Sequence, residues 1–515
     1  MHLSSAPLQP DRRHTIVIGA GVAGLAAAMR LAAGGMQVTL LERHAHPGGK
    51  IRTLPSEAGP VDAGPTVLTM RHVFDDLFGC VGEELTDHIA LIPQSILARH
   101  FWPDGSRLDL HADPLASREA IADFAGPKAA DDFTRFHKRT AQLFDAFDAP
   151  VIQAPAPQLR ELAPCVMRQP ALIRAMAPLS TLKQLLTRGF DDPRLAQLFG
   201  RYATYVGGAP HLSPAILSLI WQAEASGVWV VKGGMHKLTL AMAKLARKAG
   251  VDIRYATHVD AIRTRNGRAT GVVTDGIELM ADAVLYAGDP RALATGSMGE
   301  DLKSIAPQTL RLPRSFSARV HSFAAAVGDA PLIHHNIFFA ANPDSEFEDL
   351  VAGRMPRDPT LYLCAEDRGQ NTDTPELERF EIISNAPALS NDTPPEELEQ
   401  WHHQIMQKMA SMGVTFAPNP PPTTITTPRD FATLFPETQG ALYGQSPHGL
   451  MAAFQRPTAK TPIAGLWLAG GGTHPGAGVP MATLSARHAA EAILRDQTST
   501  SMSPPMDMRG GMSTG

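Results

Sequence analysis

A glycine-rich turn near the start of the chain limits its possible folds more than any other stretch. Residues 15–24 read TIVIGAGVAG, an apolar run followed by glycines with the spacing G-x-G-x-x-G. The first glycine permits a tight turn, the second lets the backbone approach a pyrophosphate, and the third lets strand and helix pack closely. The helix that follows, residues 25–33, presents free N–H groups to the anion. The pattern predicts a nucleotide-binding loop whose site residues are Gly19, Gly21, Val22, Ala23 and Gly24.

An acidic residue stands where such a fold needs one. A second apolar strand, residues 37–41, ends at Glu42, eighteen residues after Gly24. At this distance an acid accepts hydrogen bonds from an adenosine ribose, and Arg43 adjoins it. A lone glycine motif is weak evidence, but strand, helix, strand and acid in this order predict a Rossmann-type α/β fold.

A glycine doublet distinguishes between dinucleotides. Gly48 and Gly49 precede Lys50, and a nicotinamide-binding fold does not need this pair, whereas a flavoprotein loop runs close under an extended FAD. The run from Glu42 to Lys50 resembles the ExxxxxGG(R/K) signature of flavin amine oxidases, protoporphyrinogen oxidases and carotenoid desaturases. Residues 61–69, VDAGPTVLT with Gly64, are similar to the D-x-G-P-T segment of bacterial carotenoid desaturases. Lys50 stands where many relatives have arginine. Lysine keeps the positive charge of arginine but lacks its bidentate geometry.

A second glycine loop lies near the end of the chain. After an apolar strand at residues 466–469 the sequence reads GGGTHPGAGVP, and a helix is expected from about Pro480. The helix N-terminus can face the ribityl chain, inner phosphate or ring carbonyl of a flavin. This block resembles the G-x-G-T-H-P-G-x-G-x-P segment of phytoene desaturases. The resemblance implies cofactor contacts from Gly471, Gly472, Thr473 and Val479.

The resemblance spans residues 12–495, and the chain is identified as a member of the bacterial FAD-dependent carotenoid desaturases. Residues 61–78, 99–110 and 476–486 are most similar to the 1-hydroxycarotenoid 3,4-desaturase (methoxyneurosporene dehydrogenase) group. Phytoene desaturases generally carry I-P-G-V where residues 479–482 read VPMA, which argues against phytoene as the substrate. Phytoene desaturation stays an alternative. A flavin amine or protoporphyrinogen oxidase and a non-catalytic prenyl-lipid escort protein are more distant alternatives.

The resemblance also implies a domain organisation. A discontinuous FAD-binding domain of the glutathione-reductase and amine-oxidase kind is expected over residues 12–70, 228–290 and 455–495, with Val259 offering its backbone to the adenine. A mixed α/β substrate domain with a helical membrane-facing part is expected over residues 71–227 and 291–454. The terminal segments, residues 1–11 and 497–515, are expected to be disordered.

Local patterns predict the remaining elements. Asp104-Gly105 between alternating flanks predicts a hairpin over residues 99–110. Phenylalanines at helical spacing predict a core-packing helix over residues 117–147, and the Pro/Ala-rich residues 149–165 predict an irregular connection. Further strands are expected over residues 252–255, 258–263, 271–274, 278–280, 283–287, 317–327, 360–364 and 380–384, and further helices over residues 235–248 and 395–412.

Composition excludes several function classes. The 515 residues are 44% hydrophobic, enough for a large core and more than one domain, and a net charge of -5 gives no basic field for nucleic acid. No H-E-x-x-H occurs, and the cysteines are far apart, so neither a metal site nor a disulfide is expected and a reducing compartment fits. Neither a cleaved signal nor a spanning helix is expected. The cysteines, expected to act as small buried hydrophobes, are Cys80, Cys165 and Cys364.

One stretch is basic and apolar but contains no acidic residue. This composition of residues 166–190 suits a helix in the headgroup zone of an anionic membrane, broken into short pieces by Pro170 and Pro178. An ordinary helix that packs between surface and core is the alternative. The cations of the stretch are Arg168, Arg174, Lys183 and Arg188.

The family resemblance implies a reaction and its partners. FAD is the expected cofactor, and two hydrogens leave adjacent sp³ carbons of a carotenoid, a hydride to flavin N5 and a proton to a base or water. His474 is the first candidate base because its loop should pass the flavin, and Asp62 is the second. The alternatives are a structural loop histidine that hydrogen-bonds the backbone and a carboxylate that caps its own Asp-Ala-Gly turn.

The same resemblance implies where the protein works. Quinone or oxygen is the expected electron acceptor. Because carotenoids reside in bilayers, the enzyme should be cytoplasmic and peripherally attached to the inner membrane. Residues 166–190 are the expected docking segment.

Overall fold

Two sheets organise the chain, whose computed structural model describes residues 13–157, 159–168, 170–388, 394–449 and 451–501. The ends predicted to be disordered fall outside these ranges at residues 1–11 and 502–515. Helix α15 (Val479–Ser501) continues through residues 497–501, so the prediction that disorder begins at residue 497 is wrong.

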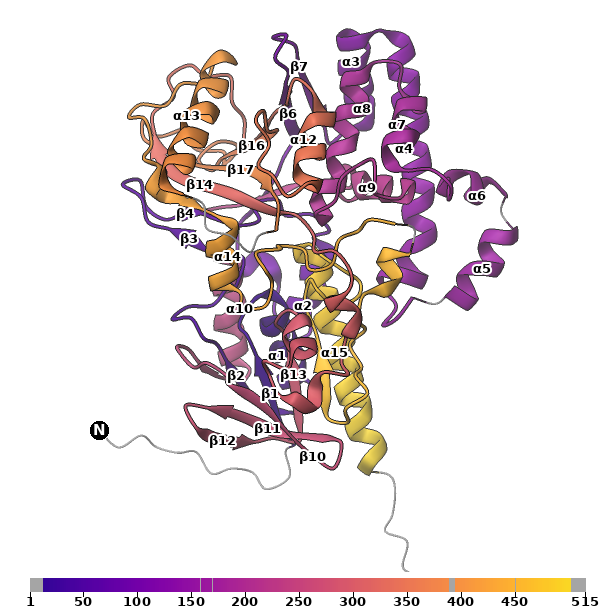
Figure 1. Ribbon diagram of the computed structural model, residues 1–515, viewed down its shortest axis with the longest axis vertical. Helices are drawn as coiled ribbons and strands as arrows, with labels where there is room; N and C mark the ends of the chain where they lie inside the picture. Colours follow the sequence, from indigo (N-terminus) through magenta and orange to yellow (C-terminus); the bar gives the residue numbers. More distant parts are fainter. Residues whose placement is uncertain (1–12, 158, 169, 389–393, 450, 502–515) are drawn as a thin grey trace, which may run out of the picture.

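A five-stranded parallel sheet lies in the lower half of Figure 1. All five strands come from the three segments predicted to bind FAD, and the two N-terminal strands match the predicted ranges within one residue. The exact domain boundaries stay a prediction. In spatial order the strands are β19 (Leu466–Leu468), β13 (Ala283–Tyr286), β1 (His14–Ile18), β2 (Gln37–Leu41) and β9 (Asp252–Arg254).

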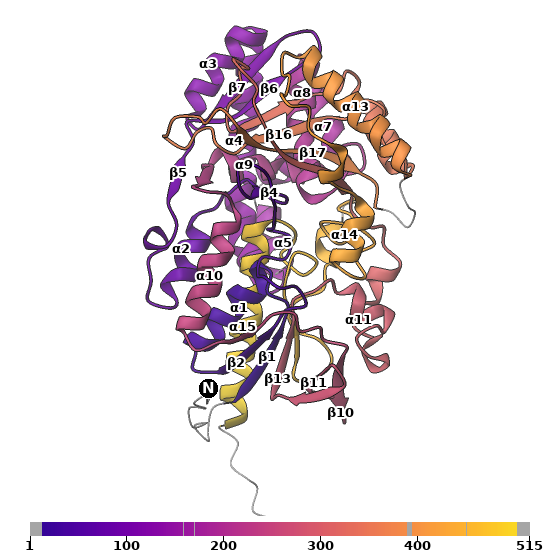
Figure 2. The same ribbon diagram turned by 90° about the vertical axis from the view of Figure 1, so that its left-hand side faces the viewer.

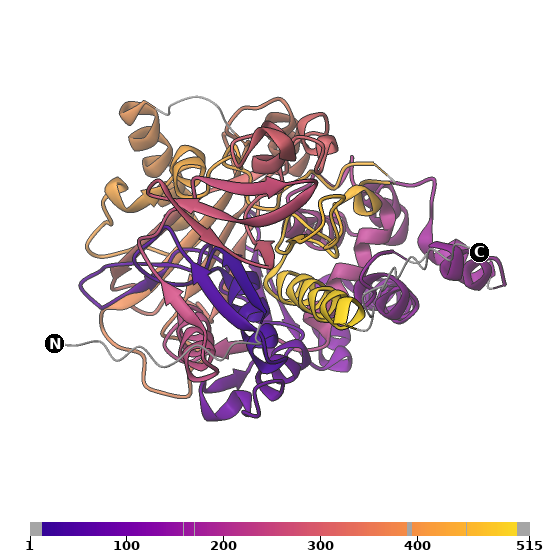
Figure 3. The same cartoon turned by 90° about the horizontal axis from the view of Figure 1, so that it is seen from below.

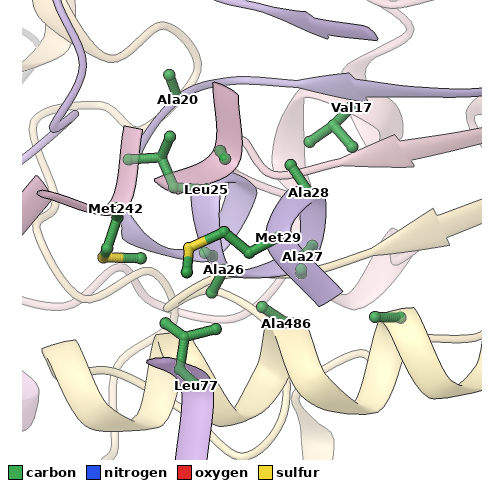
Figure 4. Packing of buried hydrophobic residues seen from close by; sticks show 14 of the residues in the cluster. Val17, Ala20, Leu25, Ala26, Ala27, Ala28, Met29, Leu77, Met242 and Ala486 are labelled. Carbon is green, nitrogen blue, oxygen red and sulfur yellow. The ribbon is translucent and has the colours of Figure 1, made fainter. Parts of the chain in front are cut away.

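The parallel sheet is covered on both faces, which explains its uninterrupted apolar strands. Val17 packs with helices α1 (Val22–Ala33), α10 (His236–Lys248) and α15, and Figure 4 shows Leu25 of α1 in this cluster with Met242 and Ala486. Ile16 packs on the other face. Figure 3 looks along α15, in yellow, beside the indigo strands. The second face is covered by a sheet of β10 (Ala261–Arg265), β11 (Arg268–Thr274) and β12 (Ile277–Met280).

A seven-stranded mixed sheet lies in the upper half of Figures 1 and 2. Helix α13 (Pro395–Ser411) packs on one face through Trp401 and Ile405 against Phe380 and Ile382. The other face packs against helices within residues 114–225. In spatial order the strands are β18 (Ile425–Thr426), β14 (Ser317–Ala325), β17 (Glu378–Ala386), β16 (Leu361–Ala365), β15 (His335–Phe338), β6 (Ile96–Phe101) and β7 (Arg107–His111).

Two short two-stranded ribbons connect the half of the molecule built on the parallel sheet with the half built on the mixed sheet. Further helices and turns surround these ribbons. The ribbons are β3 (Thr53–Leu54) with β4 (Val61–Asp62), and β5 (Leu91–Pro93) with β8 (Trp229–Val231). The surrounding elements are α2 (His72–Gly79), α8 (Pro193–Gly200), η3 (Arg201–Val206), η4 (Ala215–Leu219), α9 (Ile220–Ala225), α11 (Arg291–Thr295), α12 (Pro343–Val351) and α14 (Pro428–Leu434).

The helical segment after β7 differs from its prediction in two places. The expected helix over residues 117–147 is two helices, α3 (Pro114–Ala125) and α4 (Pro127–Phe147), because Gly126 between them has φ 90° and Pro127 begins the second. The expected irregular connection is shorter at both ends, since the π-helix η2 (Asp148–Ile152) occupies its first residues and helix α5 (Leu159–Arg168) its last. Phe133 and Phe136 are buried, as their helical spacing predicted.

The basic stretch at residues 166–190 has an inner and an outer side. Helix α6 (Pro170–Met176) begins at Pro170 and ends before Pro178, so the predicted breaks are confirmed. Leu172 of α6 and Leu182 of α7 (Leu182–Gly189) are buried, as an ordinary packed helix requires. On the outer side the exposed fractions are large for apolar residues: Met167 77%, Ile173 41% and Leu179 96%.

Two further observations bear on this stretch. Lys183 is paired with Asp344 at 2.7 Å, so its charge is partly neutralised. Helices α5 and α6 project from the side of the molecule (Figure 1). Across the described residues, no helix combines the length and apolarity needed to cross a bilayer.

Candidate active site

The two N-terminal glycine segments lie back to back. A Cβ on Gly24 would stand 1.8 Å from the carbonyl oxygen of Gly19, so only glycine lets helix and turn approach this closely. Gly21 forms a bridge with Gly48, and a Cβ on Gly49 would stand 3.0 Å from the Cα of Gly21. The structure therefore brings the glycine doublet against the first loop and leaves backbone on both sides, as a dinucleotide cradle requires.

Glu42 joins this cradle to its surroundings. Its buried carboxylate accepts hydrogen bonds from the backbone N–H groups of Ala20 at 2.6 Å and His44 at 2.8 Å. Each carboxylate oxygen can accept more than one hydrogen bond, so capacity remains for ribose hydroxyls. Arg43 is exposed beside it, and buried Val259 follows Thr257, whose N–H donates to the carbonyl of Glu42.

The C-terminal glycine loop reaches the same cradle. A Cβ on Gly470 would stand 4.0 Å from the Cβ of Ala23. The hydroxyl of Thr473 is buried and finds no hydrogen-bond partner within the described part of the chain. Gly471 accepts a hydrogen bond from Arg456 at 2.7 Å, and Val479 begins α15. An orphaned buried hydroxyl at a glycine loop fits a site that is completed by a bound group.

A net positive charge surrounds the cradle. Lys50 donates to the carbonyl of Leu442 at 2.5 Å, and the charged groups acting on it are Asp289, Arg314 and Arg456. Asp289 is itself paired with Arg314. Burial lowers the pKa of Lys50 to about 8, with the two arginines adding to the effect. Three cations against the carboxylates of Asp289 and Glu42 leave a net positive charge, which suits the diphosphate of FAD.

Both predicted bases, Asp62 and His474, are buried and engaged in hydrogen bonds. The carboxylate of Asp62 accepts from the N–H groups of Met235 at 2.5 Å and His236 at 3.3 Å. It therefore caps the N-terminus of α10, and the expectation that it caps its own turn is wrong. Its backbone N–H donates to Glu366 at 2.6 Å. Burial raises the pKa of Asp62 to about 6, and burial with the Asp62 charge raises the pKa of Glu366 to about 8.

His474 is held in a comparable way. Its Nε2 lies 3.0 Å from the carbonyl oxygen of Ala154, its ring stacks on His488, and burial lowers its pKa. Neither His474 nor Asp62 lines the cavity between the two halves. The geometry thus favours a structural role for both, and their catalytic roles stay predictions.

A mostly apolar cavity of about 260 Å³ lies between the two halves. Pro65 and Thr66, which follow Gly64, and residues Gly478, Val479 and Pro480 at the start of α15 form its border with the cradle. Its apolar walls come from helices and from the seven-stranded sheet, and they include Val67, Ile220, Ala223, Ile337, Phe339, Phe347 and Ile383.

A protein family described as flavin containing amine oxidoreductase matches residues 22–494 of the chain. The chain belongs to this family. The oxidoreductase therefore uses FAD, and the residues of the cradle fit that cofactor in backbone shape and charge.

Named relatives resemble the oxidoreductase over almost its whole length. It is 53% identical to a hydroxyneurosporene desaturase of Cereibacter sphaeroides, over 94% of this chain and 98% of that protein. A hydroxyneurosporene desaturase of Rhodobacter capsulatus is 49% identical, with 94% of this chain and 98% of that protein covered. A 4,4'-diapolycopene oxygenase of Methylomonas sp is 29% identical, over 94% of this chain and 99% of that protein.

Solved structures share the fold of the oxidoreductase. Putrescine oxidase bound to putrescine is 15% identical with a TM-score of 0.60, over 95% of this chain and 99% of that one. Cyclohexylamine oxidase from Brevibacterium oxydans is 16% identical with a TM-score of 0.57, over 95% and 100%. These likenesses show a flavin amine oxidase-like α/β fold with mixed sheets.

The cavity of the oxidoreductase contains polar groups that sequence reasoning missed. Glu224 lines the cavity together with Arg201 and Tyr205, and Tyr362 lines it from β16. The sequence patterns singled out neither Glu224 nor Tyr362. One signal was present: Glu224 is the sole acidic residue between Asp192 and Asp252.

Three buried side chains of the metal-ligating type also meet in the oxidoreductase. The candidate ligand atoms of His334, His335 and Cys364 lie within 4.8 Å of one another, although the sequence predicted no such group. His334 and Cys364 are in hydrogen-bond contact at 3.4 Å, and burial raises the pKa of the thiol well above its usual value. His335 bonds the hydroxyl of Tyr362 at 2.7 Å. Hydrogen bonding of a neutral thiol and imidazoles accounts for the group.

Lys50 should make FAD affinity depend on pH. With a pKa of about 8 in the free protein, its charge is lost as the pH rises through 8, and with it an attraction for the diphosphate. We expect FAD affinity to fall about tenfold between pH 7 and pH 9.5. Lys50→Arg keeps its charge over this range, so its affinity should stay flat. Fluorescence titration with FAD measures both, and parallel pH profiles would contradict the assignment.

Proposed function

We propose that the chain is an FAD-dependent desaturase that introduces the 3,4 double bond into 1-hydroxycarotenoids such as 1-hydroxyneurosporene. The observation that carries the proposal is the 53% identity to a hydroxyneurosporene desaturase over 94% of the chain. A mostly apolar cavity bordering the FAD cradle supports it, since a polyene needs apolar walls. The relative at 29% identity is also named for action on a carotenoid, which favours this reading over the amine oxidase and escort alternatives.

FAD, when bound, supplies the acceptor for the hydride that leaves the substrate. The chain itself positions the polyene between the sheet and the start of α15 and excludes water with side chains such as Ile337, Phe339 and Ile383. The second hydrogen leaves as a proton, for which the wall offers a hydrogen-bonded route. Thr66 Oγ1 and Tyr362 OH are 2.7 Å apart, and Tyr362 OH is 2.7 Å from His335 Nδ1.

The neutral imidazole at the end of this route can accept the proton transiently. Burial lowers the pKa of His335 well below its usual value, so one ring nitrogen is unprotonated at neutral pH. A weak base is sufficient next to a developing allylic cation, because that cation makes the neighbouring C–H acidic. Quinone or oxygen is the acceptor we propose for reoxidation.

A three-substrate assay tests the proposal. FAD-loaded protein is given liposomes that contain phytoene, neurosporene or 1-hydroxyneurosporene, and the spectrum of the extracted pigment is read. A red shift that forms much faster with the hydroxylated substrate than with neurosporene supports the proposal. Colour formed from phytoene would show the earlier desaturase instead.

We further propose that the protein docks on the cytoplasmic face of the inner membrane through the outer side of residues 166–190. Three exposed apolar residues, Met167, Ile173 and Leu179, stand among the cations Arg168 and Arg174, the composition that anionic interfaces favour. Helix α6 packs on η4, which continues into the cavity-lining helix α9. Docking there would place the bilayer close to elements that hold the substrate.

Acidic replacements test this surface. Ile173→Asp with Leu179→Asp should lower co-sedimentation with anionic liposomes about tenfold, because two apolar contacts are lost and negative charge is added. Ile277→Asp is the matched control, since Ile277 is 63% exposed but lies in β12 at the other end of the molecule (Figure 1). Equal losses in both variants would contradict the docking surface.

A further inference from the structure

A buried charged cluster forms part of the cavity wall. Glu224 accepts a hydrogen bond from Tyr202 at 2.6 Å and another from the hydroxyl of Tyr205. Arg201 donates to the Tyr205 hydroxyl at 2.6 Å and lies 3.4 Å from Glu224. The exposed fraction of Arg201 is 8% and that of Glu224 is 4%. We call Arg201, Tyr202, Tyr205 and Glu224 the Glu224 cluster.

Stability alone does not explain the Glu224 cluster. Removing two charges from water costs several kcal/mol per ion, and a well-packed apolar replacement is often as stable or more so. The surrounding wall is mostly apolar, with Val67, Ile220 and Ile337 lining the same cavity. A polyene alone would be served equally well by further apolar residues. The polar cluster therefore matches a polar group on an otherwise apolar ligand.

The cluster also has unused hydrogen-bonding capacity. A carboxylate accepts about four hydrogen bonds, and the Tyr205 hydroxyl is the donor at Oε1 of Glu224. Nε of Arg201 is buried and has no hydrogen-bond partner among the described residues. An alcohol donates one hydrogen bond and accepts others through its two lone pairs, so a carboxylate oxygen beside a guanidinium is complementary to it.

The location of the cluster agrees with this role. The cavity that Arg201, Tyr205 and Glu224 line also touches Val479 and Pro65, which border the FAD cradle. In a 1-hydroxycarotenoid a single carbon separates the carbinol carbon from the first reacting carbon, so the hydroxyl must lie in the same cavity as the reaction.

We propose that Glu224, with Arg201 and Tyr205, binds the tertiary hydroxyl of the substrate and selects 1-hydroxylated carotenoids over their non-hydroxylated counterparts. This inference rests on the proposed function. A site built to hydrogen-bond a hydroxyl leaves buried polar groups unpaired when the analogue lacks it, and this discriminates more strongly than shape. The hydroxyl also fixes how far the chain end enters the cavity.

Two tyrosines of the cluster offer a matched pair of variants. Both donate to Glu224, but Tyr205 lines the cavity and Tyr202 does not. We expect Tyr205→Phe to lower kcat/KM for 1-hydroxyneurosporene about tenfold, mainly through KM, and to leave the turnover of neurosporene within about twofold. Tyr202→Phe should change the ratio of kcat/KM between the two substrates less than about threefold, because it removes one hydrogen bond that lies outside the cavity. Glu224→Gln should lower the ratio of kcat/KM for the hydroxylated over the non-hydroxylated substrate, as Tyr205→Phe does.

The outcomes separate this inference from the proposed function. Turnover of 1-hydroxyneurosporene by the wild-type FAD-loaded protein tests the function, and the substrate ratio across the variants tests the cluster. If the wild type converts the hydroxylated substrate but Tyr205→Phe slows both substrates equally, the cluster is structural and the inference is overturned. If the wild type converts neither substrate, the binding of the desaturated hydroxycarotenoid is compared with that of its non-hydroxylated counterpart. Equal retention of the two overturns the inference. Preferential retention of the hydroxylated compound that Tyr205→Phe removes upholds it.

Discussion

Gly24→Ala should abolish FAD loading. The added Cβ would stand 1.8 Å from the carbonyl oxygen of Gly19 and 3.0 Å from its carbonyl carbon, and both are backbone atoms of the turn that is predicted to face the diphosphate. Helix α1 and strand β1 would have to separate, and α1 is packed between α10 and α15. The ratio of flavin to protein absorbance after purification should fall below about one tenth of the wild-type value, a loss of more than about 1.4 kcal/mol in binding.

Helix propensity makes the opposite prediction, so the experiment distinguishes two effects. Gly24 lies inside α1, where alanine is favoured over glycine by about 1 kcal/mol. Steric overlap at 1.8 Å exceeds that gain, because neither the turn nor the buried helix can move freely. Gly79→Ala is the matched control, since Gly79 ends α2 and a Cβ there meets nothing within 4 Å. Normal flavin content in Gly24→Ala would show that the turn yields.

The FAD half could be predicted from the sequence because its signals are local. The strand before Gly19, the acid at Glu42 and the doublet at Gly48 and Gly49 each lie within fifty residues of the N-terminus. Apolar strands and glycine spacing report backbone geometry directly. The structure then places these segments in contact, as their order implied.

The cavity could not be predicted in the same way. Tyr205, Glu224 and Tyr362 come from three separate elements, and only tertiary folding brings them to one wall. Asp62 likewise caps a helix whose first residue lies 174 positions later, a partner that local turn chemistry cannot reveal. His474 was selected for its place in a family-specific loop, yet its ring is turned toward a backbone carbonyl. Sequence patterns report which residues are present, whereas the direction of a side chain depends on packing.

Glu224→Ala should destabilise the protein by about 3–5 kcal/mol, the range for leaving one partner of a buried ion pair alone. Arg201 would keep its charge in a buried position, and the hydroxyls of Tyr202 and Tyr205 would lose their acceptor. Unfolding in guanidinium chloride measures the change. Glu399→Ala, at an exposed position of α13, is the control and should stay within about 0.5 kcal/mol of the wild type.

A paired replacement shows which group causes that loss of stability. If the cost arises from the uncompensated Arg201 charge, then Arg201→Met with Glu224→Leu should recover most of the stability, because apolar residues of similar volume replace the whole ion pair. The paired variant should fold and bind FAD, since neither residue touches the cradle. It should also lose the preference for a hydroxylated substrate, because the cavity then lacks the Glu224 carboxylate and the Arg201 guanidinium at that wall. Stability as low as that of Glu224→Ala would instead show that the two tyrosine hydroxyls, left without a partner, account for the cost.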